Sequence, residues 1–196
     1  MCNGFCKEGE KLMSTLVGLQ DIYYAKMTAD SIGGTTTYDT PKKIGHAISV
    51  DINPNVETAT LYGDNTAVAT RAKLKDISIT IESDKIPLED RAIMLGHSID
   101  SVTGAVTVKG DDKAPYVSIM FKAQTSEDTE QFYKFYKGKF APSQQTIETE
   151  GESINWQTPS MDGTFIARDS DNKIYDMVDS GSEGAATLVS NWFSQV

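Results

Sequence analysis

Histidines, cysteines and catalytic motifs are scarce in this chain of 196 residues. His46 and His97 are its only histidines, and neither has a nucleophile close by in the sequence, which disfavours a catalytic triad. The sequence contains no glycine-rich phosphate loop, no HExxH motif and no GxSxG motif. We therefore expect no enzyme activity, no cofactor, and no metal bound at a catalytic site.

The two cysteines, Cys2 and Cys6, both lie near the N-terminus, so no disulfide framework spans the chain. They supply at most half of the four ligands of a structural zinc, and we interpret them as free thiols. Residues 1–12 are polar and unlike the rest of the chain, and Met13 is a plausible second start. We expect 1–12 to be an upstream extension or terminal arm and 13–196 to form a single domain.

Long apolar runs and excess positive charge are absent too. No apolar stretch reaches the ~20 residues of a membrane helix, and no secretion leader is evident. Lysine plus arginine total 18 against 28 acidic residues, so the net charge is 18 − 28 = −10. Without such an apolar stretch we expect no membrane contact. Since phosphate affinity comes from lysine and arginine, we also expect no specific binding of nucleic acid.

Short alternating segments dominate the rest of the sequence. The clearest is 74–82, where Ile77, Ile79 and Ile81 alternate with polar residues, as in a strand with one wet face. Turn signals at 53–55 and 63–65 and a long loop at 28–43 interrupt the pattern. The expected fold class is mainly β, an antiparallel sandwich or barrel. The expected strands are 17–27, 44–52, 57–62, 74–82, 105–109, 115–123, 131–140, 147–154, 161–168 and 173–178.

One flanking helix is expected at about Pro87–Leu95. Pro87 fits a first helical turn, and Gly96 fits the left-handed position after the last turn. Its apolar stripe is Leu88, Ala92 and Leu95, which leaves Ile93 and Met94 on the other side. That second apolar side is covered either by a loop or by another molecule. We interpret His97 as a partner of the helix dipole, and we expect a short helical piece at 186–193.

An acidic row and an aromatic hairpin are the two candidate binding features. Glu148, Glu150 and Glu152 alternate, so they share one strand face. Four interpretations remain open for them: a calcium site, a carboxylate pair for hydrolysis, a negative wall, or a solvated strand face. The aromatic residues of 131–140, with three interspersed lysines, either stack bases or sugars or belong to the core.

Several short runs, in this order, resemble phage major tail proteins of the phi13 type. The resemblance extends from about Val17 to the C-terminus and leaves out residues 1–12. The runs are LVGLQDIYYA (16–25), AISV (47–50), NPN (53–55), ATLYGDN (59–65), PLED (87–90), LGH (95–97), DKAPYV (112–117), YKGKF (136–140), QTP (157–159), GTFIAR (163–168) and NWF (191–193).

The resemblance implies a structural virion protein of a long, non-contractile tail. Its subunits form hexameric rings that stack into a hollow tube, with the sheets of neighbouring subunits joined around the lumen. The tube encloses the tape-measure protein, meets the tail terminator and distal tail proteins at its ends, and conducts DNA without binding it specifically. The implied location is the virion tail, assembled in the cytoplasm of the host bacterium.

On this basis we predict the functional surfaces. Either the row of Glu148, Glu150 and Glu152 or the face of Asp76 and Glu82 lines the lumen, where negative charge lets DNA slide. The contacts between subunits are predicted at Ile93, Met94, Thr35, Thr36, Tyr38, Trp192 and Phe193. The competing hypothesis is a monomeric β-sandwich that binds carbohydrate or peptide, and an enzyme ranks third.

Overall fold

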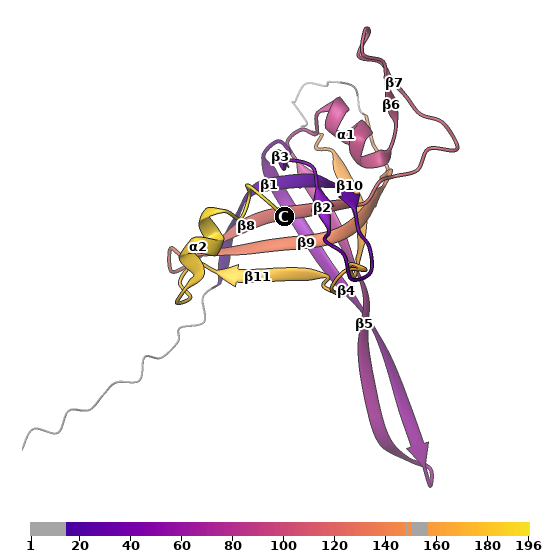
Figure 1. Cartoon of the computed structure of the whole chain (residues 1–196), viewed down its shortest axis with the longest axis vertical. Coiled ribbons are helices and arrows are strands. Elements are labelled where there is room, and N and C mark those ends of the chain that lie inside the picture. The colour runs from indigo at the N-terminus through magenta and orange to yellow at the C-terminus, as the bar shows by residue number, and fades with distance from the viewer. Residues whose placement is uncertain (1–14, 148, 150–156) are drawn as a thin grey trace, which may run out of the picture.

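The computed structural model of the chain describes residues 15–147, 149 and 157–196. Figure 1 shows a compact body of strands, with one long hairpin projecting from it and a helix with a smaller extended arm at the opposite end. Residues 148 and 150–156, which hold the predicted acidic row and most of the predicted strand at 147–154, lie outside the described residues.

One antiparallel sheet forms the body, and its main path runs β2-β1-β8-β9-β10-β5-β4. The short β3 also pairs with β1, β11 pairs with β9, and β6 and β7 form a separate ribbon. The strands are β1 (Leu16–Ala29), β2 (Thr37–Tyr38), β3 (Lys42–Lys43), β4 (Ala47–Gly63), β5 (Thr66–Ser83), β6 (Ser98–Ile99), β7 (Val106–Thr107), β8 (Val117–Thr125), β9 (Glu130–Ala141), β10 (Ser160–Ile166) and β11 (Tyr175–Asp179).

The sheet bends so that its two halves enclose the core. In Figure 1, β1, β8 and β9 run across the body while β4 and β5 descend steeply past them. Ile77, Ile79 and Ile81 of β5 all point inward, as the alternation predicts, and each is at most 2% exposed. They pack with Phe135 and Phe165 of the neighbouring strands. The ends of the main path, β2 and β4, do not pair with each other, so the fold is sandwich-like and no closed barrel forms. The predicted mainly β class is confirmed.

A second, smaller cluster lies on the other face of β8 and β9. Helix α2 (Ala185–Ser190) and the residues after it cover Met120 and Phe132 there. Trp192 is 3% exposed, and its indole meets Phe132 edge-on with 5.9 Å between ring centroids. The β8–β9 hairpin is thus covered on both faces, by the main core on one side and by the C-terminal residues on the other. This explains why aromatic residues occur on both of its sides. The predicted C-terminal helical piece is therefore present, although it is short.

Helix α1 (Leu88–Leu95) begins after Pro87 and ends at Gly96, where φ is 76°, as predicted. Its expected faces are partly wrong. Met94, expected on the outer side, is 1% exposed and belongs to the core, whereas Leu88 is 57% exposed. Helical spacing identifies the residues that share a face, but it does not show how far the sheet extends beneath the first turn.

The β4–β5 hairpin is much longer than the sequence suggests. The predicted turn at 53–55 is wrong, because β4 continues through it and Pro54 pairs with Ile77. Proline lacks an N–H, but an edge strand such as β4 has one side without ladder partners and tolerates it. The turn predicted at 63–65 is confirmed. Asp64 and Asn65 have φ values of 48° and 62°, which suit a tight two-residue hairpin turn.

The other predicted strands within the described residues are present, although their first and last residues differ from the prediction. The loop predicted at 28–43 contains the short strands β2 and β3, which return to pair with β1. The strands predicted at 105–109, 115–123, 131–140, 161–168 and 173–178 correspond to β7 to β11.

The packing of Phe165 on β9 generates a stability prediction. A Cβ added at Gly138 would fall on the Phe165 ring, with Cγ only 2.7 Å away, and that ring is fully buried. Gly138→Ala is therefore expected to lower the free energy of unfolding by about 1–3 kcal/mol. Gly110→Ala is the matched control, because a Cβ there meets nothing within 4 Å. Equal urea midpoints for the two variants would contradict the assignment of Phe165 to the core.

Candidate assembly surfaces

Four carboxylates lie on the outer face of β4, β5 and β10, opposite the core. Asp76 and Glu82, predicted to share a face, do so along β5, because residues two apart on a strand point to the same side. The register adds Asp51, paired with Thr80 from β4, and Asp162, paired with Thr80 from β10. No local pattern in the sequence predicts Asp51 and Asp162 as members of this face, because only the strand order brings them beside Asp76 and Glu82.

These carboxylates are held by neutral partners. Glu82 accepts hydrogen bonds from the hydroxyls of Ser49, at 3.1 Å, and Thr158. Asp162 accepts one from Thr80 at 2.7 Å, and Asp76 accepts one from the amide of Asn55. Within the described ranges, no lysine or arginine forms an ion pair with any of the four acidic residues. This acidic face, defined as Asp51, Asp76, Glu82 and Asp162, therefore keeps its negative charge uncompensated.

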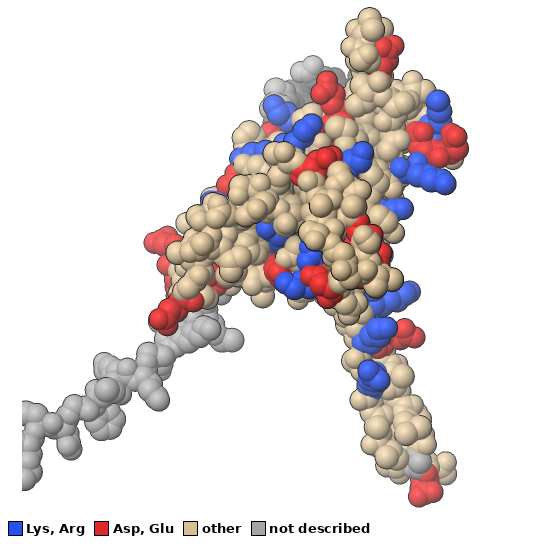
Figure 2. Space-filling view, in the orientation of Figure 1, with Lys and Arg blue, Asp and Glu red and all other residues tan. Residues whose placement is uncertain are grey.

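Beyond the body, the β4–β5 hairpin has one charged and one uncharged face. Cross-strand partners share a face, so Glu57 lies with Lys73, and Ala59 lies with Arg71. The other face contains no charged residue at all. It consists of Val56, Thr58, Thr60, Tyr62, Ala67, Thr70, Ala72 and Leu74. Figure 2 shows this arm as mostly uncharged below its junction with the body, with acidic atoms at its tip.

The uncharged face of the arm continues the core face of the body. Ile52 and Pro54 lie opposite Ile79 and Ile77, and the next residue of the same parity on β4 is Val56. Val50 on this face still packs against the core, but exposure then rises along the strand, from 36% at Ile52 to 55% at Val56 and 69% at Tyr62. A core-like strand face that extends beyond its own core marks an interaction surface.

Segment 28–43, predicted to contact other subunits, is anchored to the body by a buried ion pair. The Lys137 ammonium lies 2.8 Å from the Asp30 carboxylate and 2.7 Å from Asp169, and the Lys137 and Asp30 side chains are 6% and 5% exposed. Asp30 also accepts hydrogen bonds from the backbone N–H groups of Asp169 and Ser170. Burial alone would raise the pKa of Asp30, but the Asp169 N–H and the Lys137 ammonium lower it to about 2.

The three predicted contact residues of this segment differ in their hydrogen bonds to the rest of the chain and in their exposure to solvent. Thr36 shares hydrogen bonds with Asp30 at 3.2 Å and with the Ser170 hydroxyl at 2.7 Å. The Tyr38 hydroxyl donates to the Tyr136 carbonyl at 3.1 Å. Thr35 is exposed. Of the three, Thr35 is the one whose side chain is open to solvent.

The other predicted contact residues mostly pack within the chain. Met94 and Trp192 are buried, and Ile93 packs partly buried against the core. Phe193 stacks on Tyr23 with 4.7 Å between ring centroids. The prediction that Met94 faces outward from α1 is thus wrong, because its side chain is already enclosed by its own chain.

The aromatic hairpin is core, not a binding platform. Phe132, Phe135, Tyr136 and Phe140 are each at most 6% exposed, so their ring faces are closed to sugars or bases. Lys134 lies over Trp192 and donates to the Gln195 carbonyl at 2.8 Å. Lys134 therefore fixes the C-terminal residues to this side of the sheet.

His97 fastens the end of α1 to the loop after β7. Its Nδ1 lies 2.8 Å from an Asp112 carboxylate oxygen, and both side chains are largely buried. The Lys109 backbone N–H and His97 hold the pKa of Asp112 below its usual range. Across the residues the structure covers, no group of three histidine, cysteine or acidic side chains gathers as a metal site. None of the described helices is long and apolar enough to cross a membrane.

The buried Asp30–Lys137 pair predicts a pH-dependent stability. Because the pKa of Asp30 falls from 3.8 to about 2 on folding, its stabilising effect is complete above about pH 5 and is lost as the pH falls through 4 toward 2. Asp30→Asn is expected to lower the free energy of unfolding by roughly 3 kcal/mol at pH 7, because Lys137 loses its buried partner. The deficit, measured by urea denaturation, should shrink below pH 4.

The control is Asp39→Asn, an exposed aspartate in the same segment, whose effect should stay within about 0.5 kcal/mol at every pH. A deficit for Asp30→Asn that did not change with pH would show that the lost charge is not its cause.

Comparison with known families agrees with this arrangement. The chain matches no curated protein sequence. Residues 31–192 match the family of phage tail tube proteins, which is most of the 196-residue length and includes the acidic face, the hairpin arm and α1. A sandwich-like fold with an unpaired acidic face and a protruding strand pair is compatible with a structural subunit of this family. The chain belongs to the phage tail tube protein family and is a structural component of a virion tail.

Proposed function

We propose that copies of this chain assemble into hexameric rings that stack into the tail tube. The tube would enclose the tape-measure protein, conduct DNA, and meet the tail terminator and distal tail proteins at its two ends. Assembly would occur in the cytoplasm of the host bacterium. The observation that carries the proposal is β4, a 17-residue edge strand whose inward-parity face remains uncovered once it leaves the body.

An edge strand of this length presents a row of unpaired backbone groups, which is a template for pairing with another chain. In a ring the contact is head-to-tail, so each copy uses one sheet edge to complete the next, and closure of the ring uses up every edge. The sheet here ends at β2 and β4 without closing on itself, so both ends of its path are available for such pairing. The open edges of this sheet therefore support a proposal in which the sheets of neighbouring copies join into one continuous sheet.

We propose the acidic face as the lining of the lumen. Its four carboxylates lack basic partners among the described residues, and they point away from the core. DNA that passes through a negative channel is repelled from the wall and does not become trapped on it. Glu148, Glu150 and Glu152 remain proposed as an addition to this lining.

Electron microscopy of the concentrated, purified protein tests the assembly itself. Rings or tubes are the expected result. A species that stays monomeric at every concentration, and also in the presence of the other tail proteins, would contradict the proposal and favour a monomeric binding module.

The uncharged arm face generates a matched pair of variants. Thr60→Asp places a charge on that face, whereas Ala59→Asp places the same charge on the other face, opposite Arg71. We expect Thr60→Asp to raise the concentration needed for tube formation at least about tenfold, because the charge must be desolvated in the contact. Ala59→Asp should assemble nearly as the parent does. Sedimentation of tubes across a concentration series measures both, and equal effects would contradict the assignment of the faces.

The position of the acidic face is tested by labelling. In a variant with Cys2→Ser, Cys6→Ser and Asp162→Cys, a bulky polyethylene-glycol maleimide should modify the single thiol quickly in the monomer. Preformed tubes should protect it, because the reagent would have to enter the lumen. Met177→Cys on β11, where Met177 is 57% exposed, is the control for an exposed position that is not on the acidic face. Rapid modification of Asp162→Cys in intact tubes would place the acidic face on the outer surface.

A further inference from the structure

The two ends of the molecule carry complementary features. Figure 1 places the tip of the β4–β5 hairpin at one end of the long axis and α1 with the β6–β7 ribbon at the other. One end is a projection and the other contains a groove. When two copies join head-to-tail through such ends, one tip and one groove stay open, so the contact can be repeated from copy to copy.

The groove lies between α1 and the segment around β7. It has a volume of about 360 Å³ and is lined mainly by aliphatic side chains. Leu88 is 57% exposed and Val108 is 67% exposed, although both belong to its wall. Its lining is Leu88, Arg91, Ala92, Leu95, Val106 and Val108, together with His97 and Pro142.

Arg91 is the cation of this groove. Its guanidinium donates to the Gln145 side-chain oxygen at 3.0 Å. Among the described residues no carboxylate lies within ion-pair distance of it, and His97 is already paired with Asp112. An arginine beside an apolar surface is well suited to a partner that brings one carboxylate next to apolar side chains, because guanidinium and carboxylate match in planar, two-point geometry.

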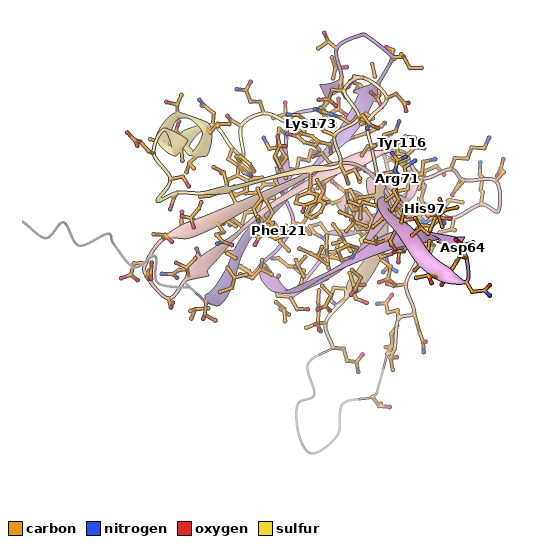
Figure 3. The ribbon with its side chains drawn as sticks, turned by 90° about the horizontal axis from the view of Figure 1, so that it is seen from below. Asp64, Arg71, His97, Tyr116, Phe121 and Lys173 are labelled. Carbon is orange, nitrogen blue, oxygen red and sulfur yellow. The ribbon has the colours of Figure 1, made fainter. Side chains whose placement is uncertain are left out.

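The tip of the hairpin has that composition. Asp64 is the only charged residue between positions 58 and 70, and it lies at the very end of the hairpin (Figure 3). Leu61 and Tyr62 immediately before it are 65% and 69% exposed. The tip is therefore one carboxylate beside a large aliphatic and an aromatic side chain, the kind of anchor that fills a pocket at a protein interface.

We propose that the hairpin tip of one copy, with Leu61, Tyr62 and Asp64, docks into the α1 groove of a second copy. Tyr62 and Leu61 contact the aliphatic wall, and Asp64 pairs with Arg91. This inference rests on the proposed tube function and names the residues of the contact between successive subunits. In this docking the exposed Leu88 gains a contact. The part of α1 that contacts another copy is then its first turn, and not the buried Met94.

A charge exchange tests the pairing. Asp64→Arg and Arg91→Asp, each alone, are expected to raise the concentration needed for tube formation about tenfold, because each places like charges together in the contact. The protein carrying both changes should return to within a few-fold of the parent. Asp64 is exposed and Arg91 is partly exposed, and neither belongs to the core, so the thermal midpoints of the unassembled variants should stay close to that of the parent. If the parent forms tubes but the combined variant needs as high a concentration as the single variants, the docking is overturned and the tube function is not.

Cross-linking of mixed copies tests the contact independently of tube formation. Two proteins are prepared with Cys2→Ser and Cys6→Ser, one carrying Tyr62→Cys and the other Val108→Cys. A short bifunctional maleimide should join them in the mixture several-fold more efficiently than it joins either protein to itself. Replacement of the Val108→Cys partner by Met177→Cys is the control.

The two failures are distinguishable. Absence of rings and tubes from the parent counts against the proposed function, while the cross-linking result still decides the contact. Failure of the Tyr62–Val108 cross-link above the control level, with or without tubes, overturns the docking.

Discussion

The alternation of β5 is the constraint on which the rest of the structure depends. Ile77, Ile79 and Ile81 must be buried, and this fixes which side of every neighbouring strand faces the core through the antiparallel register. The same register sends Asp76 and Glu82 outward, beside Asp162 of β10. A shift of one residue would bury the carboxylates and expose the isoleucines, so the acidic face and the core are two results of one pairing.

Local patterns predicted the elements well where a residue's own chemistry decides its conformation. Alternation predicts the second half of β5 and β8, Gly96 predicts the end of α1, and the residues at 63–65 predict their own turn. Prediction failed where tertiary context decides. Asn53-Pro54-Asn55 has the composition of a turn, yet an edge strand accepts it. Helical spacing predicts an outward Met94, yet the sheet encloses the side of α1 on which it lies.

The surfaces were harder to predict than the fold, because they depend on strand order. Asp51 and Asp162 are distant in sequence from Asp76 and become its neighbours only through β4 and β10. The Asp30–Lys137 pair likewise joins a loop to a strand more than a hundred residues away. The two-faced arm has a signal in the sequence, a charge-free series of alternate residues from 56 to 62, but the turn-like composition of 53–55 obscures it.

The isolated length of the β4–β5 arm has a kinetic consequence. A two-stranded ribbon without a core beneath it is only marginally stable in water, so a free subunit spends part of its time with the arm frayed. In the assembly that we propose, the first copies to meet must order their arms with few contacts in return, whereas a copy that joins an existing end finds a prepared surface. Growth from an end is therefore expected to be faster than initiation, and the length of a tube is then governed by how rarely a new one starts.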